Sequence, residues 1–433
     1  MDLTTVGILG LLLLVVLLFT RMPVGFVMGF LGFLGFSYVV NFNAGLNLLA
    51  RDVWDVFSSY GLTVIPLFVF MGQIAYQSGI SRRLYDSAYV MIGNRRGGLA
   101  MATVGACAGF SAISGSTNAT AATMATVTLP EMKRYGYDMS LATGTVAAAG
   151  SLGILIPPSV VFIVYGILTE QSIGKLFAAG ILPGVLLCIL FLVTIAVRVR
   201  LNPDLAPPGP KSTLREKLGS FAGILETLSI FLLVMGGMFF GLFTPTEAAA
   251  VGAFLTLLIA LGRRQLSWQE FVESLADTTK ISCMVMVIVT GAVIFGHFMA
   301  VTRVPYELAD WVGGLPLPPH AIMGLITVVY LLGGCFMDAL AMVMLTIPIF
   351  YPVVQVLGFD PIWFGVVIVL ITEMGVITPP VGVNVYVVYG VAKDVPLMTI
   401  FRGVFPMLLA LLICNLILLF FPQIALYLPG LMR

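Results

Sequence analysis

Small polar residues crowd into an otherwise apolar part of the chain at residues 111–118, which read Ser-Ala-Ile-Ser-Gly-Ser-Thr-Asn. Ser111 and Ser114 are three residues apart and would share one face of a helix that the following glycine ends. Their hydroxyls, with the carbonyls freed at that helix end, are hard oxygen ligands for a small cation. Ser116 and Asn118 then offer donors for a carboxylate at the start of the next helix. The alternative is that these small residues only let helices pack closely.

A proline pair interrupts two apolar stretches, Pro157-Pro158 in GILIPPSVVFIVYG and Pro379-Pro380 in GVITPPVGVNVYVVYG. Each proline removes an amide donor and displaces the carbonyl of an earlier residue. The carbonyls of residues 153–156 and 375–378 are then free to coordinate Na⁺, and the Thr378 hydroxyl can add a ligand. A simple kink is the alternative for each pair. Two pairs at equivalent places in a repeat favour the cation sites.

Four charged residues lie within or beside apolar stretches. An unpaired charge such as Asp338 is costly inside a membrane and usually functional, so Asp338 can line a solute path, help bind a cation or hold the tip of the second hairpin. A purely structural acid, paired with Arg303 or capping the hairpin arm, is the alternative. Arg303 can equally face an anionic solute or reach the lipid headgroups. Glu247 follows Thr-Pro-Thr in the form of a capping box. Glu373 can be a helix cap, a proton site or a contact of a hairpin tip.

The composition indicates which kind of secondary structure carries these residues. The chain has 433 residues, of which 60% are hydrophobic and 9% charged, and its mean hydropathy is +1.08. Soluble domains carry roughly a quarter charged residues, and their exterior must meet water. Apolar stretches of about 20 residues cross a bilayer as helices, whereas barrel strands are shorter and alternate in polarity. The sequence therefore predicts an all-α, polytopic integral membrane protein.

Charge and reactive residues narrow the function. The formal net charge of +1 argues against nucleic acid, and two histidines make a histidine metal centre unsuitable. The apolar N-terminus reads as a retained first span. The five cysteines are scattered singly in apolar runs and are predicted to be packing residues: Cys107, Cys188, Cys283, Cys335 and Cys414. We find no motif for nucleotide, zinc or serine catalysis, so the chain is predicted to be no enzyme and to draw energy from an ion or solute gradient.

Uninterrupted and interrupted apolar elements alternate along the chain. Full spans are predicted near residues 4–20, 22–42, 61–80, 176–198, 220–242, 246–262, 281–302 and 398–422. Surface helices are predicted at 44–58 and 266–279. Four apolar elements contain Gly, Pro, Ser, Thr or Asn and should lie inside the protein, because irregular backbone at membrane depth needs protein or water around it: hairpins at 97–130 and 320–350, and broken helices at 139–169 and 362–391.

The two halves form a diverged repeat, residues 1–200 and 218–433, joined by a polar linker at 201–217. An offset of 222 residues carries Pro157 onto Pro379, and also the Gly-Tyr-Asp before the first broken helix onto the Gly-Phe-Asp before the second. Lys and Arg flank the first hairpin and not the second, and the linker is basic. Since cytoplasmic loops are rich in Lys and Arg, we predict that the linker is cytoplasmic and that the hairpins enter from opposite sides, as in inverted-repeat transporters.

The motifs together resemble one family. FSAISGSTNATAATMATVTLPEM, GSLGILIPPS, TPTEAAAVGA, CFMDALAMVMLTIPIFYPV and EMGVITPPVGVNVYVV resemble the large membrane subunit of tripartite ATP-independent periplasmic (TRAP) transporters over nearly the whole chain. The resemblance implies an elevator-type, Na⁺-driven symporter of the bacterial inner membrane. It also implies two partners, a small four-helix membrane subunit and a periplasmic solute-binding protein, and an organic-acid solute such as a C4-dicarboxylate, a sialic acid or a keto acid.

The resemblance also carries residue roles onto this chain. One Na⁺ site would comprise Ser111, Ser114, Gly153, Ile156 and Pro158, and a pseudo-symmetric second site Gly334, Gly375, Thr378 and Val381. Asp338 and Ser116 would neighbour the organic anion, with Asn118 and Arg303 as further candidates. The rival interpretation is a self-sufficient Na⁺/dicarboxylate or ion-type transporter of related fold, which works without a binding protein.

Overall fold

A computed structural model describes residues 2–18, 20, 22–209 and 212–432, and these residues form helices joined by turns, with no strand among them. The α-helices are α1 Leu3–Leu18, α2 Val24–Val39, α3 Phe42–Phe57, α4 Val64–Gln77, α5 Ile80–Ile92, α6 Gly98–Ser114, α7 Thr117–Arg134, α8 Met139–Gly150, α9 Leu152–Leu155, α10 Val160–Leu168, α11 Ile173–Leu201, α12 Leu214–Phe239, α13 Pro245–Gly262, α14 Trp268–Val301, α15 Val304–Gly313, α16 Pro319–Gly334, α17 Ala339–Val356, α18 Pro361–Ile377, α19 Val383–Val391, α20 Leu397–Phe420 and α21 Gln423–Leu431. Short 3₁₀ turns lie at Tyr60–Thr63 and Pro203–Leu205.

Eight helical segments in the described part of the chain are long and apolar enough to cross a membrane. This confirms the prediction of an all-α membrane protein. One predicted boundary is wrong: the expected surface helix at 266–279 and the span from 281 form a single helix, α14, of 34 residues. The intervening sequence contains no Gly or Pro, so nothing interrupts the backbone ladder between them.

Matching caps begin the first arm of each broken helix. The Asp138 carboxylate accepts hydrogen bonds from the amides of Ser140 and Leu141, both at 3.0 Å. The Asp360 carboxylate accepts from Ile362 and Trp363 at 2.8 and 3.1 Å. Such a cap satisfies amides that have no partner within the helix. α8 and α18 therefore begin alike.

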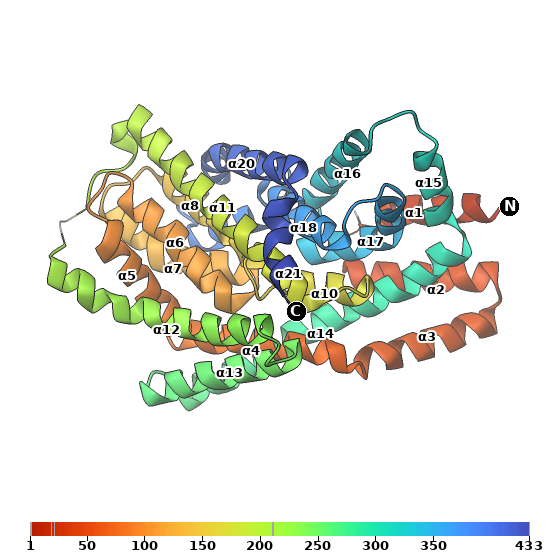
Figure 1. Cartoon of the computed structure of the whole chain (residues 1–433), viewed down its shortest axis with the longest axis horizontal. Coiled ribbons are helices and arrows are strands. Elements are labelled where there is room, and N and C mark those ends of the chain that lie inside the picture. Colours follow the sequence, from red (N-terminus) through yellow and green to blue (C-terminus); the bar gives the residue numbers. More distant parts are fainter. Residues whose placement is uncertain (1, 19, 21, 210–211, 433) are drawn as a thin grey trace.

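The helices divide into a lower layer and an upper group in Figure 1. The lower layer contains α12, α13, α4, α14, α2 and α3, in which α2 packs on α14 and α4 on α13. The α2–α14 contact is close: a Cβ at Gly291 would lie 2.0 Å from the Gly25 carbonyl oxygen. Small residues are what bring membrane helices to such distances.

The upper group contains the two helix pairs α6–α7 and α16–α17 and the two interrupted helices α8–α9–α10 and α18–α19. The second arm of each pair packs on the last part of the other half's interrupted helix, α7 on α19 and α17 on α10. Each interrupted helix also packs on the long helix of the opposite half, α8 on α20 and α18 on α11. The two halves are thus interlocked around the interruptions.

The α8–α20 contact generates a prediction about stability. A Cβ at Gly403 would lie 1.8 Å from the Ser140 carbonyl oxygen, so Gly403→Ala must push the two helices apart. We expect a loss of about 1–3 kcal/mol or more, seen as a lower midpoint of thermal unfolding in detergent. Gly324→Ala, where nothing lies within 4 Å of the new atom, is the control. Equal midpoints for the two variants would contradict the packing.

Candidate functional site

The turn between α6 and α7 meets the interruption of the first broken helix. Gly115 has φ +62°, and a Cβ there would lie 2.7 Å from the Pro158 carbonyl oxygen. A Cβ at Gly153 would lie 2.4 Å from the Ser116 carbonyl oxygen. Real Cβ atoms do not come so close, and a positive φ favours glycine. The predicted residues Gly153, Pro158 and Ser116 are therefore in backbone contact, and Ile156 lies at the same interruption in extended backbone.

Buried hydroxyls surround this contact. The Ser114 and Thr120 hydroxyl oxygens are 2.8 Å apart, and the Ser111 hydroxyl donates to the Cys107 carbonyl at 2.6 Å. All three hydroxyl side chains are buried. A hydroxyl has two lone pairs, so each oxygen can still bind a cation. Thr120 was missed from the sequence; its only signal is its place six residues beyond Ser114, across the turn.

The second half repeats the arrangement. A Cβ at Gly375 would lie 2.5 Å from the Gly334 Cα and carbonyl carbon. The Val381 amide donates to the Cys335 carbonyl at 3.3 Å, and the Thr378 hydroxyl donates to the Met374 carbonyl at 2.5 Å. The end of α16 thus lies against the interruption between α18 and α19. This brings together the predicted set Gly334, Gly375, Thr378 and Val381.

One cavity of about 230 Å³ joins the two turns. It is lined by residues 114–119 of the first turn and 338–340 of the second, with α4 and α14 of the lower layer and Ile154, Val160 and Val161 beside the first interruption. Ser116, Asn118 and Asp338 therefore line the same space. Gln73 of α4 also lines it and was missed, although an amide inside an apolar span is a detectable signal.

Ser116 and Asp338 are 222 residues apart and have the same structural role. The Ser116 hydroxyl accepts from the Ala119 amide at 3.4 Å, and the Asp338 carboxylate accepts from the Leu340 amide at 3.0 Å. They begin α7 and α17, whose N-termini both open into the cavity. A helix N-terminus carries partial positive charge and free amides, so the cavity has two elements that favour an anion.

The other charged candidates lie elsewhere. Arg303 begins α15 with φ +60°, does not line this cavity, and forms no ion pair with Asp338 among the described side chains. Glu247 makes the predicted capping box with Thr244, accepting from its amide at 2.8 Å, which confirms the cap. Glu373 is fully buried, and neither carboxylate oxygen has a hydrogen-bond partner within the described structure.

The available ligands are of one chemical kind. Among the described residues, no three His, Cys, Asp or Glu side chains lie close enough together to hold a metal ion. Hydroxyl and carbonyl oxygens dominate both places where a turn meets an interruption. Such oxygens suit hard cations and not the transition metals that prefer nitrogen or sulfur.

Comparisons with known proteins show the family to which the chain belongs. Residues 11–424 match the family described as "Tripartite ATP-independent periplasmic transporter, DctM component". The chain is 39% identical to the C4-dicarboxylate TRAP transporter large permease protein DctM of Pseudomonas aeruginosa, covering 88% of this chain and 89% of that protein. It is 34% identical to the sialic acid TRAP transporter large permease protein SiaM of Vibrio cholerae, covering 96% of each.

The fold is also similar to a solved structure, the YdaH transporter of Alcanivorax borkumensis. The TM-score is 0.66 at 16% identity, with 90% of each chain covered, and this likeness concerns the fold alone. The family match and the relatives decide the identity, because these relatives are permease subunits and not enzymes. The chain belongs to the DctM family of TRAP transporters and is a multi-pass large permease subunit of the inner membrane.

Proposed function

We propose that this chain moves a small organic acid across the inner membrane together with Na⁺, as the subunit that receives the solute from a periplasmic binding protein. The observation that carries the proposal is the single cavity onto which both helix pairs open, each through a capped helix N-terminus. Carboxylates are the solute class that such N-termini favour. The solutes named for these two relatives, C4-dicarboxylates and sialic acid, are carboxylates.

In this proposal, Na⁺ and the organic anion bind at opposite kinds of helix end. α6 and α16 end where they meet the interruptions, and helix C-termini carry partial negative charge. Cations belong at these two places: the first near Ser111, Ser114, Gly153, Ile156 and Pro158, the second near Gly334, Gly375, Thr378 and Val381. The anion belongs at the N-termini of α7 and α17, beside Ser116, Asn118 and Asp338. Bound Na⁺ would then lower the electrostatic cost of holding the anion next to it.

Asp338 needs a role compatible with an anionic solute, because a carboxylate repels another. One of its oxygens already accepts from the α17 backbone, and the remaining lone pairs can accept from a hydroxyl or ammonium group of the solute. Asp338 would thus select solutes with a donor at some distance from their carboxylate.

Transport requires the cavity to face each side in turn. We place the moving part in the upper group, where the helix pairs are re-entrant hairpins that travel with the interrupted helices against the lower layer, as in an elevator. The pseudo-symmetric halves support alternating access of this kind. A small four-helix membrane subunit completes the permease, and the binding protein delivers the solute at the periplasmic face.

Uptake into proteoliposomes tests this function. The chain and its small subunit would be reconstituted with an inward Na⁺ gradient and labelled dicarboxylates, sialic acid and keto acids, with and without the binding protein. We expect accumulation of one acid that needs both Na⁺ and the binding protein. Uptake without the binding protein would favour the self-sufficient transporter, and uptake indifferent to Na⁺ would exclude the coupling.

Ser114→Ala tests the first cation site. Removing a ligand hydroxyl should raise the Na⁺ concentration for half-maximal uptake, by about 5- to 10-fold if the lost contact is worth about 1 kcal/mol or slightly more. Ser229→Ala is the matched control, because that hydroxyl donates to a backbone carbonyl on the exposed face of α12. A Na⁺ dependence identical in folded Ser114→Ala and control protein would remove Ser114 from the site.

Two substitutions of Asp338 separate its structural and functional roles. Asparagine also caps helices, so Asp338→Asn should keep the unfolding midpoint, whereas Asp338→Ala should cost about 1 kcal/mol of stability. In the proposed function both variants raise the solute concentration for half-maximal uptake. If Asp338→Asn transports like the natural protein, Asp338 is only a cap.

A further inference from the structure

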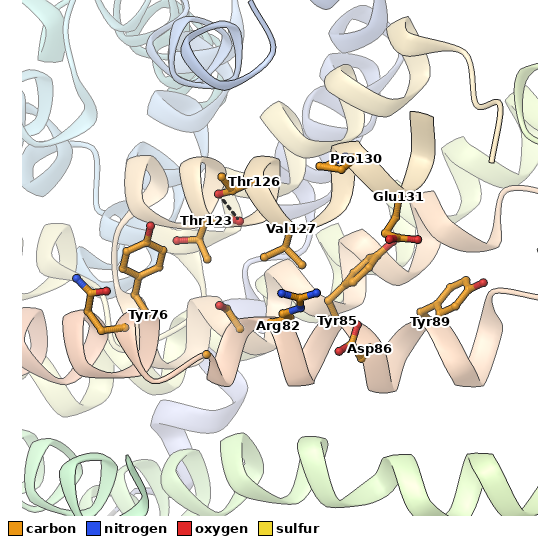
Figure 2. Close-up of a pocket in the computed structure, with 13 residues that line it drawn as sticks. Tyr76, Arg82, Tyr85, Asp86, Tyr89, Thr123, Thr126, Val127, Pro130 and Glu131 are labelled. Carbon is orange, nitrogen blue, oxygen red and sulfur yellow. Dashed lines mark hydrogen bonds between the residues drawn. The ribbon is translucent and has the colours of Figure 1, made fainter. Parts of the chain in front are cut away.

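A second and larger cavity, of about 600 Å³, lies between α4–α5 and α7. Figure 2 shows α7 above the cavity and the line of α4 and α5 below it. Its lining is mostly polar or aromatic: Tyr76, Gln77, Gly79, Ser81, Arg82, Tyr85, Asp86, Tyr89, Thr123, Thr126, Val127, Pro130 and Glu131. None of these residues lines the cavity between the hairpins.

The two cavities lie end to end along the same two helix faces. On α4, Val69, Gly72 and Gln73 line the first cavity, and Tyr76 and Gln77 line the second. Steps of three and four residues keep these side chains on one face. On α7 the same spacing leads from Ala119 to Thr123, Thr126 and Pro130. At a rise of 1.5 Å per residue, only about 4.5–6 Å along each helix separates the two linings.

The outer end of the second cavity lies among basic residues. α5 is followed by Arg95 and Arg96, and α7 ends with Lys133 and Arg134. Lys133 also pairs with Asp394 in the turn between α19 and α20. Since the cytoplasmic loops of membrane proteins are enriched in Lys and Arg, we expect this end of the cavity to open to the cytoplasm.

Two hydrogen-bond donors line the cavity, the Tyr85 hydroxyl and the Arg82 guanidinium. Tyr85 is 2% exposed, rises from α5 towards α7 (Figure 2), and its hydroxyl has no hydrogen-bond partner in the described part of the chain. A buried hydroxyl without a partner is costly, so a ligand that accepts from it is favoured. Arg82, one turn earlier on α5, lines the same cavity. It forms no ion pair within 4.0 Å among the described side chains, and the Asp86 carboxylate, one turn further along α5, attracts it at longer range.

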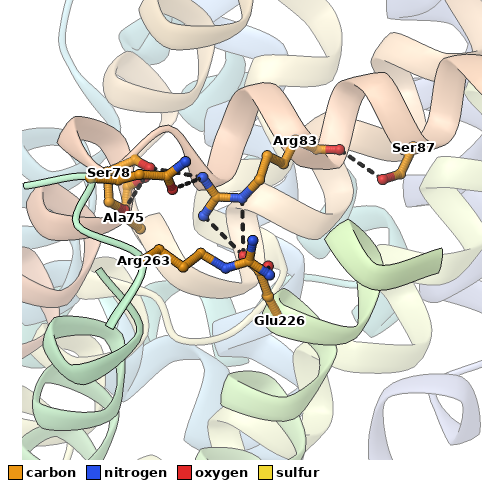
Figure 3. Close-up of polar contacts among 7 residues, drawn as sticks. Ala75, Ser78, Arg83, Ser87, Glu226 and Arg263 are labelled. Carbon is orange, nitrogen blue, oxygen red and sulfur yellow. Dashed lines mark hydrogen bonds and ion pairs between the residues drawn. The ribbon is translucent and has the colours of Figure 1, made fainter. Parts of the chain in front are cut away.

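Arg83, the next residue on α5, is by contrast held by several hydrogen bonds. Arg83 donates to the Glu226 carboxylate at 2.9 and 3.1 Å and to the Ser78 carbonyl at 3.0 Å, and it also contacts Gln265 (Figure 3). Arg263 pairs with the same Glu226. Arg83 therefore connects α5 to α12 in the lower layer, whereas Arg82 makes no such contact with α12 and lines the cavity.

We infer that the second cavity is a cytoplasmic release subsite, in which Arg82 and Tyr85 hold the carboxylate of the solute after it leaves the cavity between the hairpins. This rests on the proposed function. Gln73, Gln77 and Thr123 provide neutral hydrogen-bonding groups along the way. Asp86 directly follows Tyr85 on α5, and Glu131 of α7 interacts electrostatically with Tyr85 across the cavity. Their charges repel a carboxylate. The subsite is therefore weak and passes the anion on.

Thiol labelling tests the side and the ligand together. Thr126→Cys places a thiol on the cavity wall, and Thr128→Cys, at a fully buried position that lines neither cavity, is the control. A membrane-impermeant methanethiosulfonate should label Thr126→Cys in inside-out vesicles and not in right-side-out vesicles. Labelling restricted to right-side-out vesicles would overturn the cytoplasmic assignment. The natural chain, with its exposed Cys283, supplies the background.

Succinate and N-acetylneuraminate are then the protecting probes. The acid that is transported should slow labelling of Thr126→Cys, and adding Arg82→Gln or Tyr85→Phe should raise its half-protecting concentration about 3- to 10-fold. Arg215→Gln, an exposed cation on α12 outside the cavity, should not change it. If uptake is Na⁺-dependent but neither variant alters protection, the release subsite is wrong and the proposed function stands. If no acid is transported while labelling keeps its cytoplasmic sidedness, the proposed function fails and the release role fails with it.

Discussion

The contact between a hairpin turn and an interrupted helix is the constraint from which the rest of the arrangement follows. In the first half the backbone at Gly115 and Ser116 lies against Gly153 and Pro158, and in the second half Gly334 lies against Gly375. A single methyl group at any of these glycines would meet backbone atoms that cannot move aside cheaply. Helices that stop within the membrane leave carbonyls and amides unpaired, which apolar surroundings do not tolerate. Bringing the unpaired ends of two elements together concentrates them in two small regions.

Because these helix ends converge, the partial charges at the helix termini come together around the turns. α6 and α16 arrive with their C-termini, and α7 and α17 leave with their N-termini towards a shared cavity. The same turn thus offers partial negative charge on one side and partial positive charge on the other. Few charged side chains are needed, which is consistent with a chain that has only 9% charged residues. Asp338 is the exception, and it begins α17 as Ser116 begins α7.

Much of this arrangement was predictable because it depends on residues whose backbone chemistry is unusual. Proline pairs, glycines before them and a hydroxyl cluster are visible without a structure, and the offset of 222 residues pairs them across the halves. The predicted boundary near residue 280 failed for the opposite reason, since a change of polarity does not end a helix when no Gly or Pro is present.

Tertiary packing decided what the sequence did not reveal. Thr120 meets Ser114 only because α7 folds back on α6, and Gln73 reaches the cavity only because α4 lies beneath the turn, where a Cβ at Gly72 would be 3.0 Å from the Ser114 Cα. Arg303 was a candidate from its type and position, yet it lies at the start of α15 and outside the cavity.

The walls of the two cavities come from both the lower layer and the upper group. The wall formed by α4 and α5 contacts both parts of the molecule. α4 packs on α13 and Arg83 of α5 pairs with Glu226 of α12 in the lower layer, while α4 and α5 also pack on α6 of the first hairpin. The opposite wall, α7, belongs to the hairpin and packs on α8 and α19. A displacement of the upper group along the lower layer would carry α7 past α4 and α5 and alter both cavities at once. One helix therefore lines both cavities, and in the proposed mechanism the face of α7 from Ser116 to Glu131 would couple the solute site to the release subsite.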